Sequence, residues 1–434
     1  MPYLLDFVYL LLILLASPWL IYRAVRQGKY RQGFAEKLLG LAPRRAGDRP
    51  GVWFHAVSVG EVNLLASLLD EIRRQRPWWE CVVSTTTITG YAVARKKYPT
   101  LTVFYCPLDF SWSVRAAMKR VRPSLLVLAE LELWPNLVRA ARSQGARVAI
   151  VNGRLSDRSL RGYRRLRPFV GPVLRQIDLV AAQNDEYSRR FIELGAAPAA
   201  VCVTGSIKYD GAQTDRGNSA TSRLRVLAGI GDDDVVFLAG STQEGEEAAS
   251  LATYQSLSRE FPKLRLIVVP RHPERFAAVA QLLDSSRVAW QRRSRLDLEG
   301  PRPEAGVLLV DTVGELGAWW GVAAIAFVGG SLGSRGGQNM IEPAAYGAAV
   351  SFGPNTRNFR DIVAALLAHQ AAVIVRDERE LAAFVRRCLA DVEYRQSLGC
   401  AARQLVASQS GATARTLALL VPLVDSSRGQ KAAA

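Results

Sequence analysis

The apolar positions of this chain form short, continuous runs that alternate with longer amphipathic stretches. Continuous apolar runs are typical of strands buried on both faces of a parallel sheet, and the stretches between them have helical spacing. The alternation therefore predicts βαβ units, and it occurs in two series. The first series predicts strands at residues 52–57, 81–84, 101–105, 125–129, 148–151, 179–182 and 201–204.

A loosely patterned segment at residues 210–222 separates the two series and is interpreted as a linker. The second series predicts strands at residues 235–239, 265–269, 288–290, 307–310, 323–328, 349–352 and 373–375. We therefore expect an α/β protein of two Rossmann-like, doubly wound domains, with a cleft at the carboxyl ends of their strands, where such sheets bind ligands. The expected organisation is an anchor helix at 1–22, a basic connector at 23–50, an N-terminal domain at 51–209, the linker, a C-terminal domain at 223–423 and a tail at 424–434.

The first apolar run differs from the others because residues 3–22 are almost uninterrupted. This run is about long enough to cross the hydrocarbon core of a bilayer, and Trp19 and Tyr22 suit its interface. Basic residues follow at once, which by the positive-inside tendency places the remaining chain in the cytoplasm. We expect a single-pass anchor; the alternative is an amphipathic helix that lies on the membrane.

The formal net charge of +17 indicates a partner with negative charge, either nucleic acid or an anionic membrane lipid surface. Zinc-finger spacing and a basic zipper are both absent from the sequence, so we expect no nucleic-acid partner. The five cysteines are scattered without a CxxC pair and are interpreted as reduced core residues. Because the three histidines are far apart in sequence, we expect no metal site.

The second domain is organised around residues 327–347, FVGGSLGSRGGQNMIEPAAYG. An apolar strand leads into a glycine-rich loop and then into a predicted helix with Asn339 and Glu342 at its start. Glycines allow a ligand to approach the backbone, and a helix N-terminus offers unpaired N–H groups to an anion. The stretch predicts a nucleotide site, with a carboxylate for sugar hydroxyls; the alternative is a glycine-rich turn that binds nothing.

Three carboxylates stand at the ends of strands in the first domain. Glu61 lies in the first turn of a predicted helix, where the helix dipole keeps a carboxylate ionised and suited to general-base catalysis; the alternative is a helix cap. Glu130 and Glu132 follow the strand at 125–129 and point the same way if the chain is extended. They would repel each other unless a cation or hydroxyl groups lie between them; the alternative is a structural role in neighbouring turns.

Basic side chains also follow several strands. Six arginines between residues 154 and 167 predict a surface for phosphate or anionic head groups, although a solvated helix face is the usual explanation of such runs. Lys208 follows the last strand of the first domain. In the second domain Arg271 and His272 follow one strand, and a turn with Gly314 follows another, on the edge where ligands bind.

Taken in order, these motifs resemble the Kdo transferases, membrane-anchored enzymes that add 3-deoxy-D-manno-octulosonic acid (Kdo) to a lipid A precursor. The resemblance covers nearly the whole chain and rests on HAVSVGE, ELELWPN, NGRLSDRS, GSIKYD, GSTQEGEE, PRHPER, DTVGEL and GGS…GGQNMIEPAAYG. It implies the GT-B fold, with the acceptor on the N-terminal domain and the nucleotide on the C-terminal domain. It also implies an inverting, metal-independent glycosyltransferase of lipopolysaccharide biosynthesis at the inner membrane, which uses CMP-Kdo as donor substrate and no cofactor.

The resemblance implies a role for each matching residue. Glu61 matches the general base, and Glu130 or Glu132 together with Lys208 match positions that stabilise the transition state. The arginine run is expected to bind the lipid A precursor through Arg154, Arg158 and Arg161. The positions expected to bind CMP are Arg271, His272, Val313, Gly314, Glu315, Asn339, Met340, Ile341 and Glu342.

The chain departs from the family pattern at three positions. Gln338 stands where the family usually has histidine, Ser206 where asparagine is common, and Gly153 where alanine is common. These departures leave donor details and the number of Kdo residues transferred open. Two alternatives remain: a transferase or epimerase of the same fold that uses another nucleotide sugar, and a non-catalytic binder of acidic lipid head groups.

Overall fold

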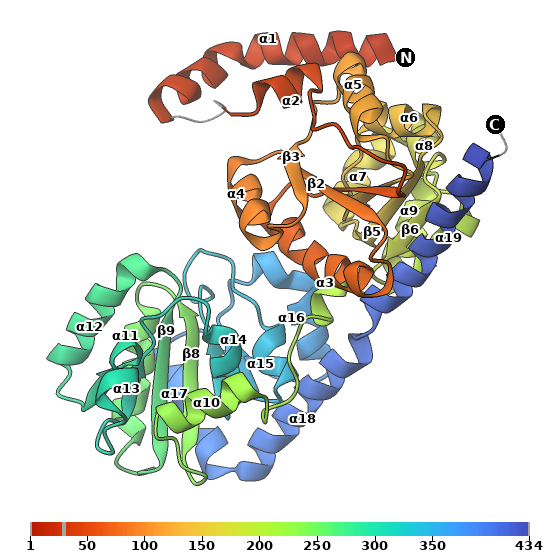
Figure 1. The fold of residues 1–434 in the computed structure, drawn as a ribbon. Helices are drawn as coiled ribbons and strands as arrows, with labels where there is room; N and C mark the ends of the chain where they lie inside the picture. Colours follow the sequence, from red (N-terminus) through yellow and green to blue (C-terminus); the bar gives the residue numbers. More distant parts are fainter. Residues whose placement is uncertain (1, 28–31, 433–434) are drawn as a thin grey trace. The chain divides into compact units, whose positions relative to one another are not determined.

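The computed structural model describes residues 2–27 and 32–432, and the chain divides into two compact units (Figure 1). Unit 1 comprises Met1–Asp210 together with Ser410–Ala434, and unit 2 comprises Gly211–Gln409. Each unit is built on a seven-stranded sheet whose described strand pairs are all parallel. The expectation of two doubly wound α/β domains is therefore confirmed.

The sheet of unit 1 has the order β3-β2-β1-β4-β5-β6-β7. Its strands are β1 Gly51–His55, β2 Glu80–Thr85, β3 Thr102–Tyr105, β4 Leu125–Ala129, β5 Arg147–Gly153, β6 Leu179–Ala182 and β7 Val201–Val203. Its helices are α1 Pro2–Gln27, α2 Phe34–Leu39, α3 Val59–Gln75, α4 Ile88–Lys97, α5 Ser111–Val121, α6 Pro135–Ser143, α7 Asp157–Arg165, α8 Arg167–Leu174, α9 Asp185–Leu194, α19 Ala412–Ala432 and the short 3₁₀ turns η1 Pro198–Ala200 and η2 Ile207–Tyr209.

Strands buried on both faces explain the continuous apolar runs of the sequence. In β1, Val52 and Phe54 pack in the core on one face of the sheet, and Trp53 packs in the core on the other face. All three side chains are fully buried, because helices cover both faces of a parallel sheet. The strands predicted for this domain are found within two residues of their expected ends.

The sheet of unit 2 has the order β10-β11-β9-β8-β12-β13-β14. Its strands are β8 Val235–Thr242, β9 Leu264–Pro270, β10 Trp290–Arg292, β11 Val307–Leu309, β12 Ile325–Val328, β13 Ala349–Phe352 and β14 Ala372–Ile374. Its helices are α10 Ser219–Leu227, α11 Glu246–Leu257, α12 Phe276–Ser285, α13 Arg293–Glu299, α14 Leu316–Trp319, α15 Ile341–Ala345, α16 Arg360–Ala368, α17 Glu378–Ala390, α18 Val392–Gln409 and the 3₁₀ turns η3 Pro273–Arg275, η4 Trp320–Val322 and η5 Arg357–Phe359.

The last helix differs from the expectation, because α19 belongs to unit 1 and not to the C-terminal domain. Its Leu417, Leu420 and Val424 are buried in the core on the β1 face of the first sheet. Asp210 accepts hydrogen bonds from the backbone N–H groups of Gly411 and Thr413 at the start of this helix. The expected tail is also helical, since α19 continues to Ala432.

The N-terminal helix α1 is fastened to unit 1 by polar side chains. Asp6 is buried and accepts hydrogen bonds from the backbone N–H and the hydroxyl of Ser111, at 2.8 and 2.6 Å, which caps α5. One turn further on, the Tyr9 hydroxyl donates to Asp109 at 3.1 Å. Among the described residues, no helix combines the length and the apolar character needed to cross a membrane. The expected single-pass anchor is therefore not confirmed.

The sheet order places the candidate residues at the switch point of each sheet. In unit 1 the parallel strands β1 and β4 are neighbours, and from this pair the successive strands are added outward in opposite directions, β2 and β3 on one side and β5 to β7 on the other. Glu61 and Glu130 follow β1 and β4. In unit 2 the corresponding neighbours are β8 and β12, and the glycine-rich loop follows β12. Ligands of doubly wound sheets bind at such switch points, so the topology favours these two places as sites.

Candidate active site

Three carboxylates and one lysine meet at the carboxyl edge of the first sheet. Lys208 of η2 lies 3.0 Å from Glu130 Oε1 and forms an ion pair with it. Burial is the main cause that raises the pKa of Glu61 and of Glu132; the charge of Glu130 adds to both shifts, and the charge of Glu61 adds to that of Glu132. The fold therefore brings together the four side chains predicted to be catalytic, which are Glu61, Glu130, Glu132 and Lys208. Their chemical roles stay predictions.

Glu61 is held firmly at the start of α3. Its Oε2 accepts a hydrogen bond from the Val57 backbone N–H at 2.8 Å, and its Oε1 accepts one from the Ser58 hydroxyl at 2.7 Å. Ser58 in turn accepts from the Glu61 backbone N–H, which is a reciprocal helix cap. Burial raises the pKa of Glu61 and these hydrogen bonds oppose the rise. Glu61 is thus a helix cap, as the alternative interpretation predicted. The capping hydrogen bonds also fix the orientation of the carboxylate that is predicted to act as the base.

Glu130 has a strained backbone. Its φ of 53° lies in the left-handed region that residues other than glycine seldom adopt. Asn152 at the end of β5 has the same φ. Such strain costs about 1–3 kcal/mol per residue and clusters at functional sites. The Glu130 N–H donates to Val151 O, and Asn152 Oδ1 accepts from the Ile207 N–H beside Lys208. These two strained residues hold the Glu130–Lys208 pair in place.

Glu132 lies half-buried in the loop between β4 and α6. The Trp134 indole N–H donates to its Oε2 at 3.2 Å. Burial, with a further contribution from Glu61, raises the pKa of Glu132 to about 7. The same Trp134 packs edge-on against His55, whose complete burial lowers its pKa to about 4. His55 is therefore neutral at pH 7, and Glu132 is only about half ionised there.

Replacing Lys208 by methionine should lower kcat/KM by about 10²-fold, the usual effect of removing one group that stabilises developing charge. The loss of the ion pair itself should change the free energy of unfolding by less than about 1 kcal/mol, because both partners are partly exposed to solvent. Steady-state kinetics and urea unfolding measure the two effects. A Lys208→Met enzyme with wild-type kcat/KM would contradict the catalytic role of Lys208.

The arginine-rich segment forms α7 and the start of α8. Arg158 and Arg161 are exposed on α7, and Arg154 is half-buried just before it. Arg164 forms an ion pair with Glu193, and Arg190 of α9 forms one with Asp157. Of the arginines in the run, Arg164 is therefore neutralised within the unit. The acceptor role of Arg154, Arg158 and Arg161 stays a prediction.

The glycine-rich loop after β12 is bound by a buried glutamate. Glu246, at the start of α11, is 1% exposed. Its carboxylate accepts hydrogen bonds from the backbone N–H groups of Gly330, Ser331 and Leu332, at 2.7, 2.9 and 2.9 Å, and from that of Gln243 at 2.8 Å. These three loop N–H groups are already bonded to a protein carboxylate, so they are not available to a phosphate. The nucleotide site expected at this stretch stays a prediction.

The helix expected at the end of the loop is short, since α15 has only five residues. Asn339 donates to Glu342 Oε1 at 3.0 Å and accepts from the Ile341 N–H at 3.0 Å, so these two predicted residues form one polar unit. Burial raises the pKa of Glu342. The side chains of Met340 and Ile341 are buried in the core, so only their backbone groups remain for a ligand.

The other residues predicted to bind CMP lie at the ends of β9 and β11. Arg271 is exposed and its backbone N–H donates to Thr242 O, while His272 is half-buried beside Glu274. In the turn before α14, Val313 is 77% exposed and Gly314 has a φ of 96°. The next residue, Glu315, accepts two hydrogen bonds from the guanidinium of Arg293, at 2.9 and 2.8 Å. Its carboxylate also accepts one from the hydroxyl of Thr312 at 2.7 Å.

The electrostatic setting of Glu315 follows from these contacts. Burial tends to raise its pKa, but the hydrogen bonds from Arg293 and Thr312 outweigh burial and lower it. Glu315 is thus an ionised acceptor at pH 7. It can receive hydrogen bonds from the hydroxyl groups of a sugar, whereas it would repel a phosphate.

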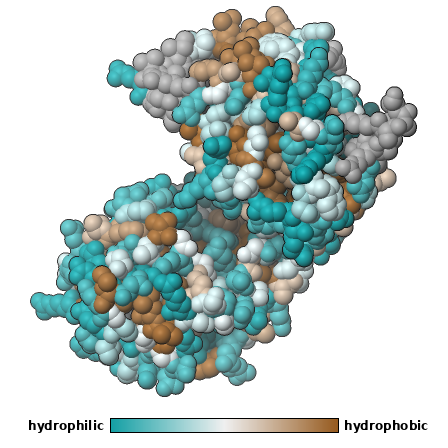
Figure 2. Space-filling view, in the orientation of Figure 1, coloured by the Kyte–Doolittle hydropathy of each residue, from teal (hydrophilic) through white to brown (hydrophobic). Residues whose placement is uncertain are grey.

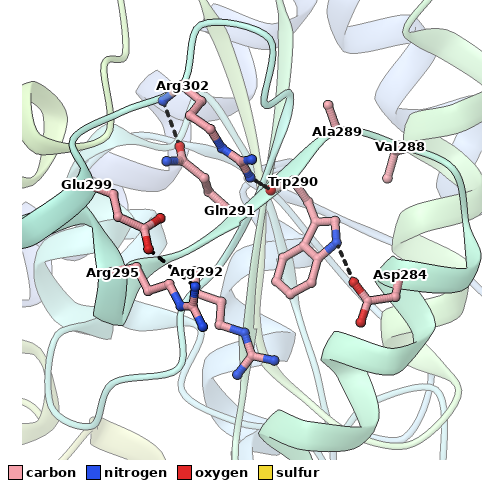
Figure 3. Close-up of a pocket in the computed structure, with 9 residues that line it drawn as sticks. All are labelled: Asp284, Val288, Ala289, Trp290, Gln291, Arg292, Arg295, Glu299 and Arg302. Atoms are coloured by element: carbon pink, nitrogen blue, oxygen red, sulfur yellow. Dashed lines mark hydrogen bonds and ion pairs between the residues drawn. The ribbon is translucent and has the colours of Figure 1, made fainter.

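A separate hollow of about 490 Å³ lies at the outer edge of the second sheet (Figure 3). Trp290 and Arg292 of β10 line it, and Arg302 closes the strand edge by donating to Trp290 O. Arg295 is paired with Glu299, and Trp290 with Asp284. None of the residues predicted to bind CMP lines this hollow, so it is distinct from the expected nucleotide site.

Several residues that hold the site were not singled out by the sequence. Glu246 stands in the quoted GSTQEGEE motif without a role, and Arg293 and Asn152 had none either. Of these three residues, only Glu246 had a sequence signal that could have indicated its role, because acidic residues there follow a strand and begin a helix. Within the described chain, no group of three or more His, Cys, Asp or Glu residues is placed to hold a metal ion. The metal-independent mechanism stays a prediction.

Comparison with known proteins gives a consistent picture. Residues 28–211 match the model of a family described as 3-Deoxy-D-manno-octulosonic-acid transferase (kdotransferase). A 3-deoxy-D-manno-octulosonic acid transferase of Haemophilus influenzae is 33% identical over 425 residues, which cover 96% of this chain and 99% of that protein. One of Bordetella pertussis is 36% identical over 414 residues, covering 92% and 94%. The UDP-GlcNAc 2-epimerase of Neisseria meningitidis, 12% identical, matches with a TM-score of 0.57 over 86% of this chain and 100% of that chain, which shows a shared fold.

Proposed function

The chain belongs to the 3-deoxy-D-manno-octulosonic acid (Kdo) transferase family and is a glycosyltransferase of lipopolysaccharide biosynthesis, and we propose that it moves Kdo from CMP-Kdo to a lipid A precursor with inversion. The observation that carries this proposal is the cluster of Glu61, Glu130, Glu132 and Lys208 at the switch point of the first sheet. The cluster contains an oriented carboxylate and a cation, the two groups that such a transfer needs from the protein.

In the proposed reaction a hydroxyl oxygen of the acceptor sugar attacks the anomeric carbon of Kdo. The new C–O bond forms as the bond from that carbon to the phosphate oxygen breaks, and CMP leaves with the bonding electrons. The hydroxyl proton passes to Glu61, whose raised pKa brings it closer to the operating pH, as an efficient general base requires. Lys208 offsets negative charge on the donor, and Glu130 fixes the lysine in place.

Unit 2 is proposed to hold the nucleotide. Glu315 and the Asn339–Glu342 unit provide acceptors and a donor for sugar hydroxyls, and exposed Arg271 provides positive charge for the phosphate. Because Glu246 already occupies three N–H groups of the glycine-rich loop, Arg271 and His272 carry more of the phosphate recognition than the loop does.

The acceptor is amphiphilic, and unit 1 has a matching surface. Phe7, Leu11 and Leu14 are exposed on α1, as are Phe34 and Leu39 on α2, and apolar side chains gather over α1 in Figure 2. We propose that this face contacts the cytoplasmic side of the inner membrane as an interfacial helix, with basic residues near anionic head groups.

Donor consumption tests this function. With a tetra-acylated lipid A precursor present, the protein should release CMP from CMP-Kdo, and it should release no UDP from UDP-GlcNAc. Release of CMP should stop when the acceptor is omitted. Turnover of the UDP-sugar with no use of CMP-Kdo would instead support a transferase or epimerase that acts on another nucleotide sugar. Binding without turnover of any donor would support a non-catalytic lipid binder.

The raised carboxylate pKa values predict opposite effects of pH on activity and stability. As pH rises through about 7, Glu132 becomes ionised, and Glu61, whose pKa is also raised, becomes ionised at a higher pH than an ordinary glutamate, so kcat/KM should rise along this acid limb. The folded-state pKa of Glu132 exceeds its ordinary value of 4.5, so the folded protein binds this proton more tightly than the unfolded chain does. The stabilisation that the bound proton contributes is therefore lost as pH rises from 4.5 to about 7. Glu132→Gln should flatten this decline in urea unfolding. An unchanged slope would contradict the shifted pKa.

A further inference from the structure

A groove of about 430 Å³ in unit 1 joins the N-terminal helix to the carboxylate loop. Its lining includes Tyr9, Leu12 and Ile13 of α1 together with residues of the loop that carries Glu132. The complete lining is Tyr9, Leu12, Ile13, Leu108, Asp109, Phe110, Leu131, Glu132, Leu133, Trp134 and Tyr163. The groove has the size of a small-molecule site, and most of its lining is aliphatic or aromatic.

The polar groups in this lining are largely satisfied by hydrogen bonds within the protein. The Asp109 carboxylate accepts hydrogen bonds from the Tyr9 hydroxyl and from the backbone N–H groups of Asn136 and Leu137 at the start of α6. Glu132 accepts from Trp134. Because the Asp109 carboxylate already has its hydrogen-bond partners, it needs none from a ligand. The groove therefore presents a mainly apolar surface, with the Glu132 carboxylate in its lining.

The outer end of the groove continues into the apolar face of α1. Leu12 and Ile13 line the groove and are at the same time 56% and 38% exposed, so they belong to both surfaces. Tyr163 comes from α7, the helix that also carries exposed Arg158 and Arg161. The apolar groove, the Glu132 carboxylate and the basic helix α7 thus lie close together. The groove suits an acyl chain, and the arginines of α7 suit the phosphate of a phosphorylated sugar.

We propose that this groove binds one acyl chain of the acceptor and so directs its sugar hydroxyl toward the Glu61–Glu132 cluster. The inference rests on the proposed function. It assigns α1 a second role: besides contacting the membrane, the helix forms one wall of the acceptor site. The network of Asp6, Tyr9 and Asp109 keeps that wall in register with the loop that carries Glu132.

The test compares two acceptors with the same phosphorylated disaccharide, one tetra-acylated and one fully deacylated, in detergent micelles. Ile13→Trp narrows the groove at α1, and Leu108→Trp narrows it at the segment that precedes α5. Each should raise KM for the acylated acceptor by about tenfold or more, as expected when a bulky side chain fills an apolar pocket. Each should leave KM for the deacylated acceptor within about twofold of the wild-type value. Leu298→Trp, at a 92% exposed site in unit 2, is the matched control and should change neither value.

The outcomes separate this inference from the proposed function. Tryptophan is well accommodated at membrane interfaces, so a helix that only touched the membrane would tolerate Ile13→Trp, and an unchanged KM for the acylated acceptor would overturn the groove assignment. Equal losses with both acceptors would also overturn it, because they would indicate a distorted loop. Wild-type protein that transfers Kdo to neither acceptor would refute the proposed function instead.

Discussion

Glu61→Gln should abolish most of the transfer while it leaves the fold intact. The amide keeps an oxygen that can accept a hydrogen bond at the start of α3, so the cap is only partly weakened and the free energy of unfolding should fall by no more than about 1 kcal/mol. The amide cannot take the hydroxyl proton, and removing a general base lowers the rate by about 10²–10⁴-fold. Measured kcat with saturating donor and acceptor should show this loss.

The matched control for this variant is Glu71→Gln, on the same helix. Glu71 pairs with Arg74 on the surface of α3 and lies outside the carboxylate cluster. Its replacement should change kcat less than twofold. If Glu61→Gln retained full kcat, Glu61 would be a helix cap and nothing more, and the base would have to be sought at Glu132.

Glu246→Gln should destabilise unit 2 and weaken nucleotide binding together. Four backbone N–H groups converge on the Glu246 carboxylate, two on each oxygen. A glutamine presents an NH₂ group to two of these donors, and each unsatisfied buried donor costs about 1–3 kcal/mol. The free energy of unfolding should therefore fall by about 3 kcal/mol, and the dissociation constant for CMP should rise as the loop from Gly330 to Leu332 loses its anchor. Urea unfolding and calorimetric CMP titration measure the two effects.

Glu244→Gln is the control for that experiment, because Glu244 lies in the same turn but is exposed. It should leave both stability and CMP affinity close to the wild-type values. Wild-type stability in Glu246→Gln would show that the loop does not depend on this carboxylate. A stable Glu246→Gln protein with tighter CMP binding would indicate that the loop N–H groups bind the phosphate after all.

The positions of most strands along the chain were predictable because a parallel sheet imposes a local signal. The central strands are buried on both faces, so their residues are mostly apolar, and β4 and β13 have the ends that the apolar runs predict. The residues at the ends of strands were predictable for the same reason, since parallel strands bring their carboxyl ends to one edge of the sheet. Glu61, Glu130 and Lys208 are far apart in sequence and meet there.

What the sequence could not reveal depends on contacts between distant segments. The burial of Leu420 against the first sheet assigns α19 to unit 1, and no feature of that helix names its partner. The occupation of the loop N–H groups by Glu246 depends on residues more than eighty positions away. Asp6 seemed to be one polar residue in an apolar run, yet it is the residue that fastens α1 to α5.

The mass of the acceptor after reaction tests the central claim most directly. Incubation of the full chain with CMP-Kdo, generated in place, and a tetra-acylated lipid A precursor should yield an acceptor heavier by one or more whole Kdo residues, and the same incubation with Glu61→Gln should leave the acceptor mass unchanged over the same time. An acceptor that gains no Kdo with the wild-type protein, or gains it equally fast with Glu61→Gln, would contradict a Kdo transfer carried out by this carboxylate cluster.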